Sequence, residues 1–223
     1  MQPVGTVVAF GAAPTRAAAR LDMASLACDL VPADASLFPR IKQLRGGALL
    51  LLLAASEDDP ALAAAAKAAR ILRQRGGGPA VLVLPPAPAL PGPQARSRLS
   101  RAAALTDCCA LRPVGSAGWE DAVRCLAEPL SVFGLVGVER REILDLLAPR
   151  PALLHLWDDE SLDRSLREAR DVLVTCRLRP NAALAEVDAA QKRVCAVTSA
   201  RLVLAGPEVQ DDDGPRAIAA VFL

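Results

Sequence analysis

The sequence lacks the features that mark several common classes of protein. It has a single histidine, His155, and none of its six cysteines forms a C-x-x-C pair, which argues against a structural zinc site. Its most apolar run, Ala48–Ala55, is eight residues long, far short of the roughly 20 that a membrane helix needs. The first ten residues also lack the basic start of a secretory signal. We therefore expect a soluble, cytoplasmic protein with reduced core thiols.

A strong overall charge is also missing. The formal net charge is +1, so no global field attracts nucleic acid or an anionic membrane. Apolar residues make up 52% of the chain and charged residues 23%, which is typical of a globular protein. We expect no nucleic-acid partner and no membrane span. Arginine and alanine are abundant, which we interpret as the coding bias of a GC-rich bacterial genome.

In the first half of the chain, short apolar runs alternate with alanine-rich amphipathic segments. The pattern predicts strands at 4–10, 26–31, 48–55, 81–84 and 108–111, with helices at 15–23, 60–75 and 95–105. This alternation indicates an α/β fold with a Rossmann-like, doubly wound parallel sheet. Gly76–Gly78 could be mistaken for a phosphate loop, but it follows a helix, so we interpret it as the turn that ends the helix.

The pattern changes at Trp119. A helix over 119–130, which Pro129 should kink or shorten, leads into a second block of strands at 152–157, 172–178, 201–205 and 216–222. Helices are predicted between them at 161–169 and 182–194. The last two strands flank an acidic turn, which indicates a mixed sheet in a smaller C-terminal α/β domain. The predicted division is 1–118, 119–150 and 151–223.

Two stretches resemble the FtsZ/tubulin family. Val123–Ile143 (VRCLAEPLSVFGLVGVERREI) is similar to FtsZ's central helix and synergy loop, V-x-x-I-x-x-L-I-x-x-P-G-L-I-N-V-D-F-A-D-V. Ala200–Phe222 resembles the family's closing strands, in which an apolar strand ends in glycine and an acidic turn leads to a second strand. The parts occur in the family's order over nearly the whole chain. The resemblance implies a GTPase-like domain, a connecting helix and a smaller C-terminal domain.

The segments that hold GTP phosphates in this family are altered. The family's turns G-G-G-G-S-N and G-G-G-T-G-T-G bring backbone N–H groups close to an anion. The corresponding residues here are Gly11, Ala12, Ala13, Pro14, Thr15 and Arg16 in the first turn, and Ser56, Glu57, Asp58 and Asp59 in the second.

These replacements disfavour a triphosphate. Pro14 has no N–H to donate, and three carboxylates of the second turn would face the phosphate charge. We interpret the second turn as a helix start, with Asp59 as the N-cap and Pro60 as the first helical residue. A Mg²⁺ site or an acid/base pair is the alternative for the acids, and binding of another anion is the alternative for Arg16. We predict no cofactor and no GTP binding.

The synergy-loop segment keeps its acidity. The resemblance places Gly137 at the family's Asn, and Glu139 and Glu142 at its two Asp, with Arg140 and Arg141 between them. In the family this loop reaches the nucleotide of the next subunit. Two interpretations stay open: a solvated face that begins a helix, or a loop that still faces an FtsZ-like partner.

Three functions follow from these observations. The first is a non-catalytic FtsZ-like protein that acts through protein contacts, either on an FtsZ-type filament or in its own assembly. The second is a divergent GTPase, or a subunit that stimulates hydrolysis in a neighbour through Glu139 or Glu142. The third is an unrelated doubly wound protein that binds a small ligand. A continuous parallel sheet without a long helix between the two blocks would favour the third.

Overall fold

A computed structural model describes residues 4–33, 37–43, 49–74, 77–131, 139–178, 185–209 and 217–223. The strands are β1 (Gly5–Phe10), β2 (Cys28–Pro32), β3 (Leu49–Ala54), β4 (Ala80–Val83), β5 (Cys109–Pro113), β6 (Pro151–Leu156), β7 (Asp171–Leu178), β8 (Arg201–Val209) and β9 (Ala217–Phe222). The helices are α1 (Ala12–Ala18), α2 (Leu37–Ile41), α3 (Asp59–Gln74), α4 (Pro93–Thr106), α5 (Trp119–Ser131), α6 (Arg140–Leu146), α7 (Leu162–Leu166) and α8 (Ala185–Val197).

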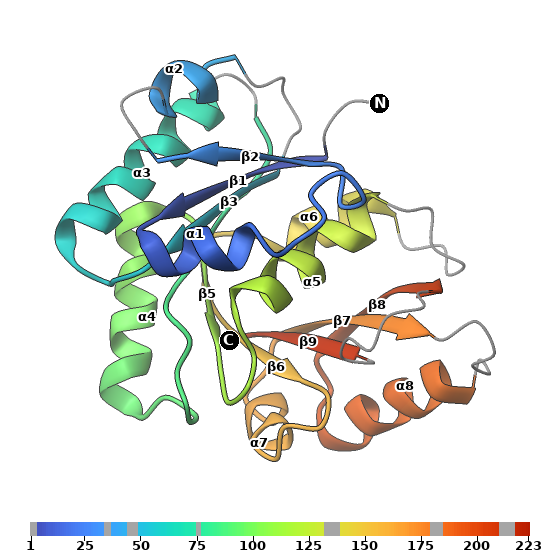
Figure 1. The fold of residues 1–223 in the computed structure, drawn as a ribbon. Coiled ribbons are helices and arrows are strands. Elements are labelled where there is room, and N and C mark those ends of the chain that lie inside the picture. Colours follow the sequence, from blue (N-terminus) through green and yellow to red (C-terminus); the bar gives the residue numbers. More distant parts are fainter. Residues whose placement is uncertain are drawn as a thin grey trace.

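The strands form one mixed sheet in the order β2-β1-β3-β4-β5-β6-β9-β7-β8 (Figure 1). From β2 to β6 all neighbours are parallel. Strand β9 then runs antiparallel between β6 and β7, and β8 is parallel to β7. The predicted α/β fold, with a doubly wound parallel part and a mixed C-terminal part, is confirmed.

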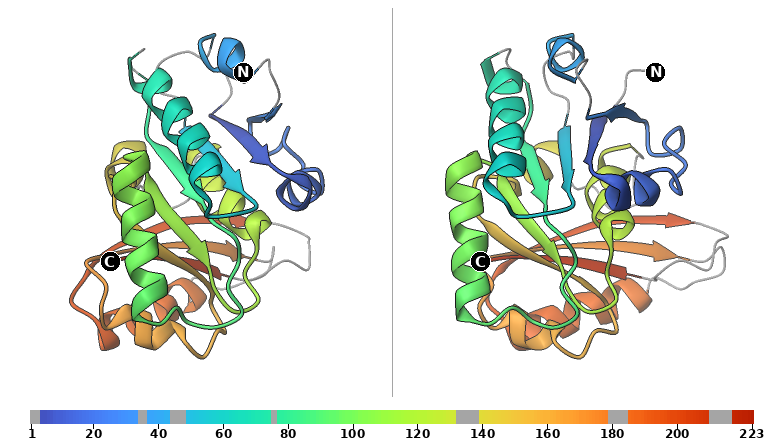
Figure 2. Two further views of the ribbon diagram at one scale, coloured as in Figure 1. Left: turned by 90° about the vertical axis from the view of Figure 1, so that its left-hand side faces the viewer. Right: turned by 60° about the vertical axis from the view of Figure 1, so that its left-hand side comes forward.

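Helices cover both faces of the sheet. The leucine run of β3 is fully buried, with alternate side chains in two different cores, as expected for a parallel strand covered on both sides. One core lies under α1, α5 and α6, and the other under α2, α3 and α4. Figure 2 shows α3 and α4 side by side on their face. A third core lies between α7, α8 and the strands β7 and β9.

Several details differ from the sequence-based predictions. The first helix begins earlier than the predicted 15–23, directly after β1, and α2 was not predicted. The closing strands β8 and β9 do not pair with each other, because β7 lies between them. The acidic turn between them lies outside the described residues. Pro129 lies inside α5, where the sequence predicted a kink or an end.

The two blocks of the chain share the sheet. Strand β5 of the first block pairs with β6 of the second, with Ala110 opposite Pro151 and Pro113 opposite Leu154. The division into 1–118, 119–150 and 151–223 therefore stays a prediction. No helix in the described part of the chain combines the length and apolarity needed to cross a bilayer.

Candidate functional site

The two altered turns lie together at the carboxyl edge of the sheet. They follow the parallel neighbours β1 and β3, and the Ala55 N–H donates to the Phe10 carbonyl at 3.1 Å. Gly11 has a φ of 101°, and a Cβ at this position would lie 2.8 Å from the Cβ of Ala55. Glycine is therefore required at Gly11 by both its conformation and the close approach of the β3 turn. In doubly wound sheets, ligands bind outside this edge.

The first turn closes on itself. The Thr15 hydroxyl and the Thr15 N–H both donate to the Gly11 carbonyl, at 2.7 and 3.2 Å. Pro14 is buried, while Ala12 and Arg16 are exposed and Ala13 is half-buried. Arg16 lies on the surface of α1. This helix has only seven residues.

The start of α3 is capped by the chain's own carboxylate. Asp58 Oδ1 accepts a hydrogen bond from the Ala61 N–H at 3.0 Å. This bond, followed by a side-chain bond from Ser56, holds the pKa of Asp58 below its usual value of 3.8. The prediction of Asp59 as N-cap is wrong by one residue: α3 begins at Asp59, which places Pro60 at the second helical position. Proline is tolerated there because first-turn N–H groups have no partner within the helix.

Glu57 forms an ion pair with Arg112 of β5, which the sequence analysis did not identify. The Arg112 side chain is only 7% exposed and that of Glu57 is 29% exposed. The bond links the turn after β3 to a strand two positions away in the sheet. One signal was available: Arg112 is a lone charge beside the apolar run Cys108–Leu111, and a buried charge needs a partner.

Two cavities open near this edge. One, of about 480 Å³, lies at the ends of β1 and β2 and is lined mainly by apolar groups, without a lysine or arginine: Ala9, Phe10, Gly11, Thr15, Leu30, Val31 and Ala33. The other, of about 420 Å³, lies between the start of α3 and helix α4, and its lining carries both signs of charge: Glu57, Asp58, Leu62, Pro85, Arg98, Arg101 and Ala102. Among its described lining residues, the first cavity offers a phosphate group no cation.

The synergy-loop-like segment begins helix α6, which contacts α5 and β7. Glu139 and Glu142 form a capping box, in which each side chain accepts from the other's backbone and the Glu139 N–H lies 3.2 Å from Glu142 Oε2. Both acids and the arginines between them, Arg140 and Arg141, are exposed. These acids begin α6, and contact with an FtsZ-like partner through them stays a prediction. Gly137 lies outside the described residues.

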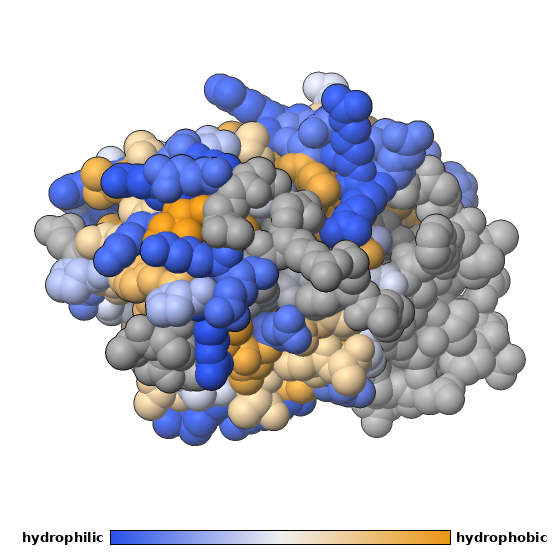
Figure 3. Space-filling view, turned by 90° about the horizontal axis from the view of Figure 1, so that it is seen from above, coloured by the Kyte–Doolittle hydropathy of each residue, from blue (hydrophilic) through white to orange (hydrophobic). Residues whose placement is uncertain are grey.

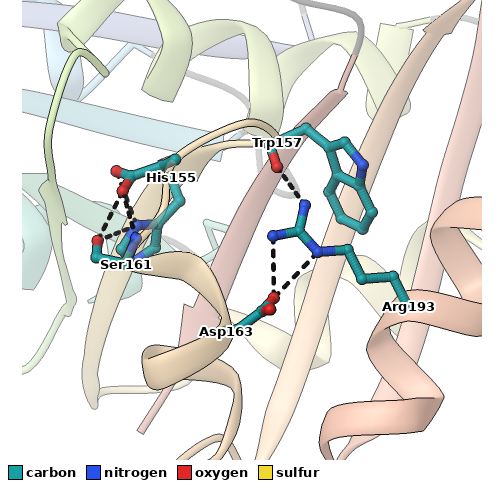
Figure 4. A network of polar contacts seen from close by, with 6 residues as sticks. His155, Trp157, Ser161, Asp163 and Arg193 are labelled. Atoms are coloured by element: carbon teal, nitrogen blue, oxygen red, sulfur yellow. Dashed lines mark hydrogen bonds and ion pairs between the residues drawn. The ribbon is translucent and has the colours of Figure 1, made fainter.

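His155 belongs to a polar cluster in the C-terminal part of the chain (Figure 4). Its Nδ1 lies 3.2 Å from Asp159 and 3.4 Å from the Ser161 hydroxyl, which donates to the same carboxylate at 2.8 Å. Burial lowers the pKa of His155, although Asp159 opposes this. Serine and acid share one side of the ring, whereas a hydrolytic triad places them on opposite nitrogens. The cluster therefore shapes the turn before α7.

A second group in Figure 4 holds α8 in place. The Arg193 guanidinium lies 4.8 Å from the centre of the Trp157 ring and donates to the Trp157 carbonyl and to Asp163. Cation–π contacts and charge-assisted hydrogen bonds both favour arginine at such a site. Its two partner residues, Trp157 and Asp163, lie after β6 and in α7, so Arg193 has a structural role.

No protein-family model matches this sequence, and no curated protein matches it. Solved structures do match the fold. An FtsZ dimer from M. jannaschii, described as empty, aligns over 100% of this chain and 89% of its own, with a TM-score of 0.67 and 15% sequence identity. The chain has the FtsZ fold. A mutant FtsZ from the same organism aligns over 84% of this chain and 67% of its own, with a TM-score of 0.54 and 13% identity.

The fold bears on the third function considered above, an unrelated doubly wound protein that binds a small ligand. That alternative predicted a continuous parallel sheet without a long helix between the two blocks of the chain. The sheet is continuous, but its C-terminal part is mixed, and the 13-residue helix α5 separates β5 from β6. The FtsZ structure aligns over the whole chain, so the fold is FtsZ-like, while binding of a small ligand stays a prediction.

Proposed function

We propose that this chain is a non-catalytic FtsZ-like protein of the cytoplasm that acts through contacts with other proteins. Its partner would be an FtsZ-type filament, which it modulates or caps, or further copies of itself. The observation that carries the proposal is the state of the carboxyl edge, where the chain's own carboxylates occupy positions suited to an anion. Asp58 accepts from the start of α3, and Glu57 neutralises the buried Arg112.

GTP would have to displace these contacts. A phosphate at the start of α3 would compete with Asp58 for the Ala61 N–H and would lie beside the charge of Glu57. Like charges in a partly desolvated site repel strongly. The glycines that would let backbone amides approach an anion closely are absent from Ser56 to Asp59. These features together support a pseudo-GTPase.

The proposed partner rests on the fold. The structure that aligns over the whole chain is an FtsZ dimer. By analogy, we infer that this chain also has a surface that pairs with another subunit of the same fold. Fold alone does not determine function, and the partner therefore needs a direct measurement.

Two experiments test the proposal. Titration of the purified chain with fluorescent GTP in the presence of Mg²⁺ should give no saturable signal, and saturable binding at micromolar GTP would overturn the loss of nucleotide binding. Co-sedimentation with an FtsZ from the same organism should show association or altered filament mass. The filament role is refuted if the chain does not associate with FtsZ, leaves the filament mass unchanged and does not assemble with itself.

Stimulation of hydrolysis in a neighbouring subunit is the alternative. Glu139 and Glu142 already serve the capping box of α6, so we expect Glu139→Ala and Glu142→Ala to leave a partner's GTPase rate unchanged. A fall of that rate in both variants, with binding intact, would favour the alternative instead.

A further inference from the structure

Between its two ends the α3–α4 pair carries one sign of charge, while acids lie at the ends themselves: Glu57, Asp58 and Asp59 before Pro60, and Asp107 after Thr106. From Pro60 to Thr106 the sequence contains no aspartate or glutamate, but it contains seven basic residues: Lys67, Arg70, Arg73, Arg75, Arg96, Arg98 and Arg101. The net charge of the whole chain is only +1, so charge is strongly segregated. A cluster of this kind creates a local positive potential that the overall balance conceals.

Two of these basic residues are already neutralised by neighbours. Arg73 pairs with Asp107, and Arg96 pairs with Glu168. Arg70, Arg98 and Arg101 are exposed and form no ion pair within the described part of the chain. Like-charged side chains three residues apart on one helix, as in Arg98 and Arg101, are destabilising in isolation. An external anion would relieve this repulsion.

The basic residues flank a seam between the two helices. The cavity of about 420 Å³ near the start of α3 is lined in part by Arg98 and Arg101. A second cavity, of about 220 Å³, lies further along the same pair of helices and is lined by Ala66, Arg70, Arg73, Gln74, Leu105, Thr106 and Asp107. We call this surface the α3–α4 seam. Figure 2 shows the two helices side by side. Figure 3 shows the end of the molecule that carries α2, where hydrophilic side chains surround small apolar areas.

The seam also offers apolar contact. Leu105 is 53% exposed, the highest value among the large apolar side chains of the described residues. Ala66 and Leu105 line one cavity, and Leu62 and Pro85 line the other. An exposed leucine that shares a cavity with the unpaired Arg70 suits a ligand with both acidic and apolar groups.

We propose that the α3–α4 seam binds an acidic polypeptide segment that also carries apolar side chains, such as an amphipathic acidic helix. An acidic polypeptide with apolar side chains can satisfy both the basic and the apolar groups of the seam, whereas the phosphates of a nucleic-acid duplex would satisfy only the basic ones. The residues that line it include no aromatic ring on which bases could stack. Leu105 alone also provides little apolar area for insertion into a membrane.

The seam adjoins the proposed pseudo-nucleotide edge, because Glu57 and Asp58 line its first cavity, but its occupancy does not require the loss of GTP binding. Fluorescence anisotropy with a labelled helical peptide of leucine and glutamate, at low salt, tests it directly. The wild-type chain should bind this peptide and should ignore a peptide with lysine in place of glutamate. Binding should weaken as salt rises.

Matched charge reversals locate the site. We expect Arg98→Glu/Arg101→Glu to weaken peptide binding by about tenfold or more. The control is Arg164→Glu/Arg167→Glu, which reverses two exposed arginines with the same spacing near α7, and it should change binding by less than about twofold. Thermal unfolding of both variants checks that they remain folded. Arg70→Glu provides an independent reversal on α3.

Three results would overturn the proposal. The first is the absence of peptide binding to the folded wild-type chain. The second is an equal loss of binding in the two double variants. The third is tighter binding to a 20-base-pair DNA duplex, or to vesicles containing phosphatidylserine, than to the peptide. None of these results affects the measurement of GTP binding, so failure here is distinct from failure of the proposed function.

Discussion

Replacement of Glu57 by alanine would leave Arg112 without its counter-ion in a nearly dry position. The Arg112 side chain is 7% exposed, and its Nε already lacks a hydrogen-bond partner within the described structure. Breaking a buried ion pair by removing one partner costs about 3–5 kcal/mol. Because Glu57 is partly exposed and water can enter in its place, we expect about 2–4 kcal/mol. For a chain of this length, that range corresponds to a fall in Tm of about 4 to 16 °C.

Replacement of the other partner, Arg112, should cost less stability. Arg112→Met removes the buried charge, and Glu57 can then turn to water, so we expect a cost of less than about 1.5 kcal/mol. The double variant Glu57→Ala/Arg112→Met should be about as stable as Arg112→Met alone. Urea unfolding of the wild type, the two single variants and the double variant gives the free energies for this double-mutant cycle. Glu120→Ala is the control, since Glu120 pairs with Arg20 at 3.6 Å on an exposed surface and should cost at most about 1 kcal/mol. Equal costs for Glu57→Ala and Arg112→Met would refute the reasoning.

Three further predictions concern stability and reactivity. Asp58→Ala should lower the midpoint of urea unfolding through loss of the α3 cap, whereas Asp58→Asn should change it little. Burial holds the pKa of His155 below 6.5 in the folded chain, so the unfolded chain binds a proton at this residue more readily. The contribution of His155 to the free energy of unfolding should therefore be fully present above pH 6.5 and should fall as the pH drops below it. His155→Leu should reduce this pH dependence. Cys195 is the exposed thiol, while burial raises the pKa of Cys109 and Cys125 to about 12. A thiol reagent should therefore modify Cys195 first under native conditions, as measured by mass spectrometry, and modification of Cys109 at the same rate would contradict this.

Local chemistry allowed much of the fold to be predicted. Apolar runs bounded by glycine, proline or acidic turns identified the nine strands, because burial on both faces requires such runs. Helix α2 was missed because it is only five residues long. Strand order depends on tertiary packing, so the pairing of β5 with β6 and the place of β7 between β8 and β9 could not be read from periodicity.

The candidate site shows the same limit. The turns after β1 and β3 were identified through the family resemblance, and they lie together because these parallel neighbours end at one edge of the sheet. The cap at Asp58 was missed by one residue, since both aspartates before Pro60 satisfy the same preference. Arg112 lies 55 residues from Glu57, and no local pattern specifies such a partner. The basic seam was hidden because the balance of charge over the whole chain is near zero.

The ion pair also indicates how the positive charge at the carboxyl edge can be neutralised without a nucleotide. Arg112 is a buried cation beside the start of α3, and Glu57 supplies the negative charge that a small anion would otherwise bring. If this view is correct, Glu57→Ala should gain a weak site for inorganic phosphate. Added phosphate should then raise the Tm of Glu57→Ala more than that of the wild type, by RT ln(1 + [L]/Kd), or about 1 kcal/mol when the concentration is about fourfold above Kd.

A second variant tests whether Arg112 is the group that binds the phosphate. In the Glu57→Ala/Arg112→Met chain the buried charge is gone, and phosphate should stabilise it no more than the wild type. Sodium chloride at equal ionic strength controls for screening. If phosphate stabilises all three chains equally, the effect is exclusion from the surface rather than binding, and Glu57 is then a partner of Arg112 without standing in for an anion. A selective effect would mean that the edge retains a usable cation that the chain's own carboxylate keeps covered.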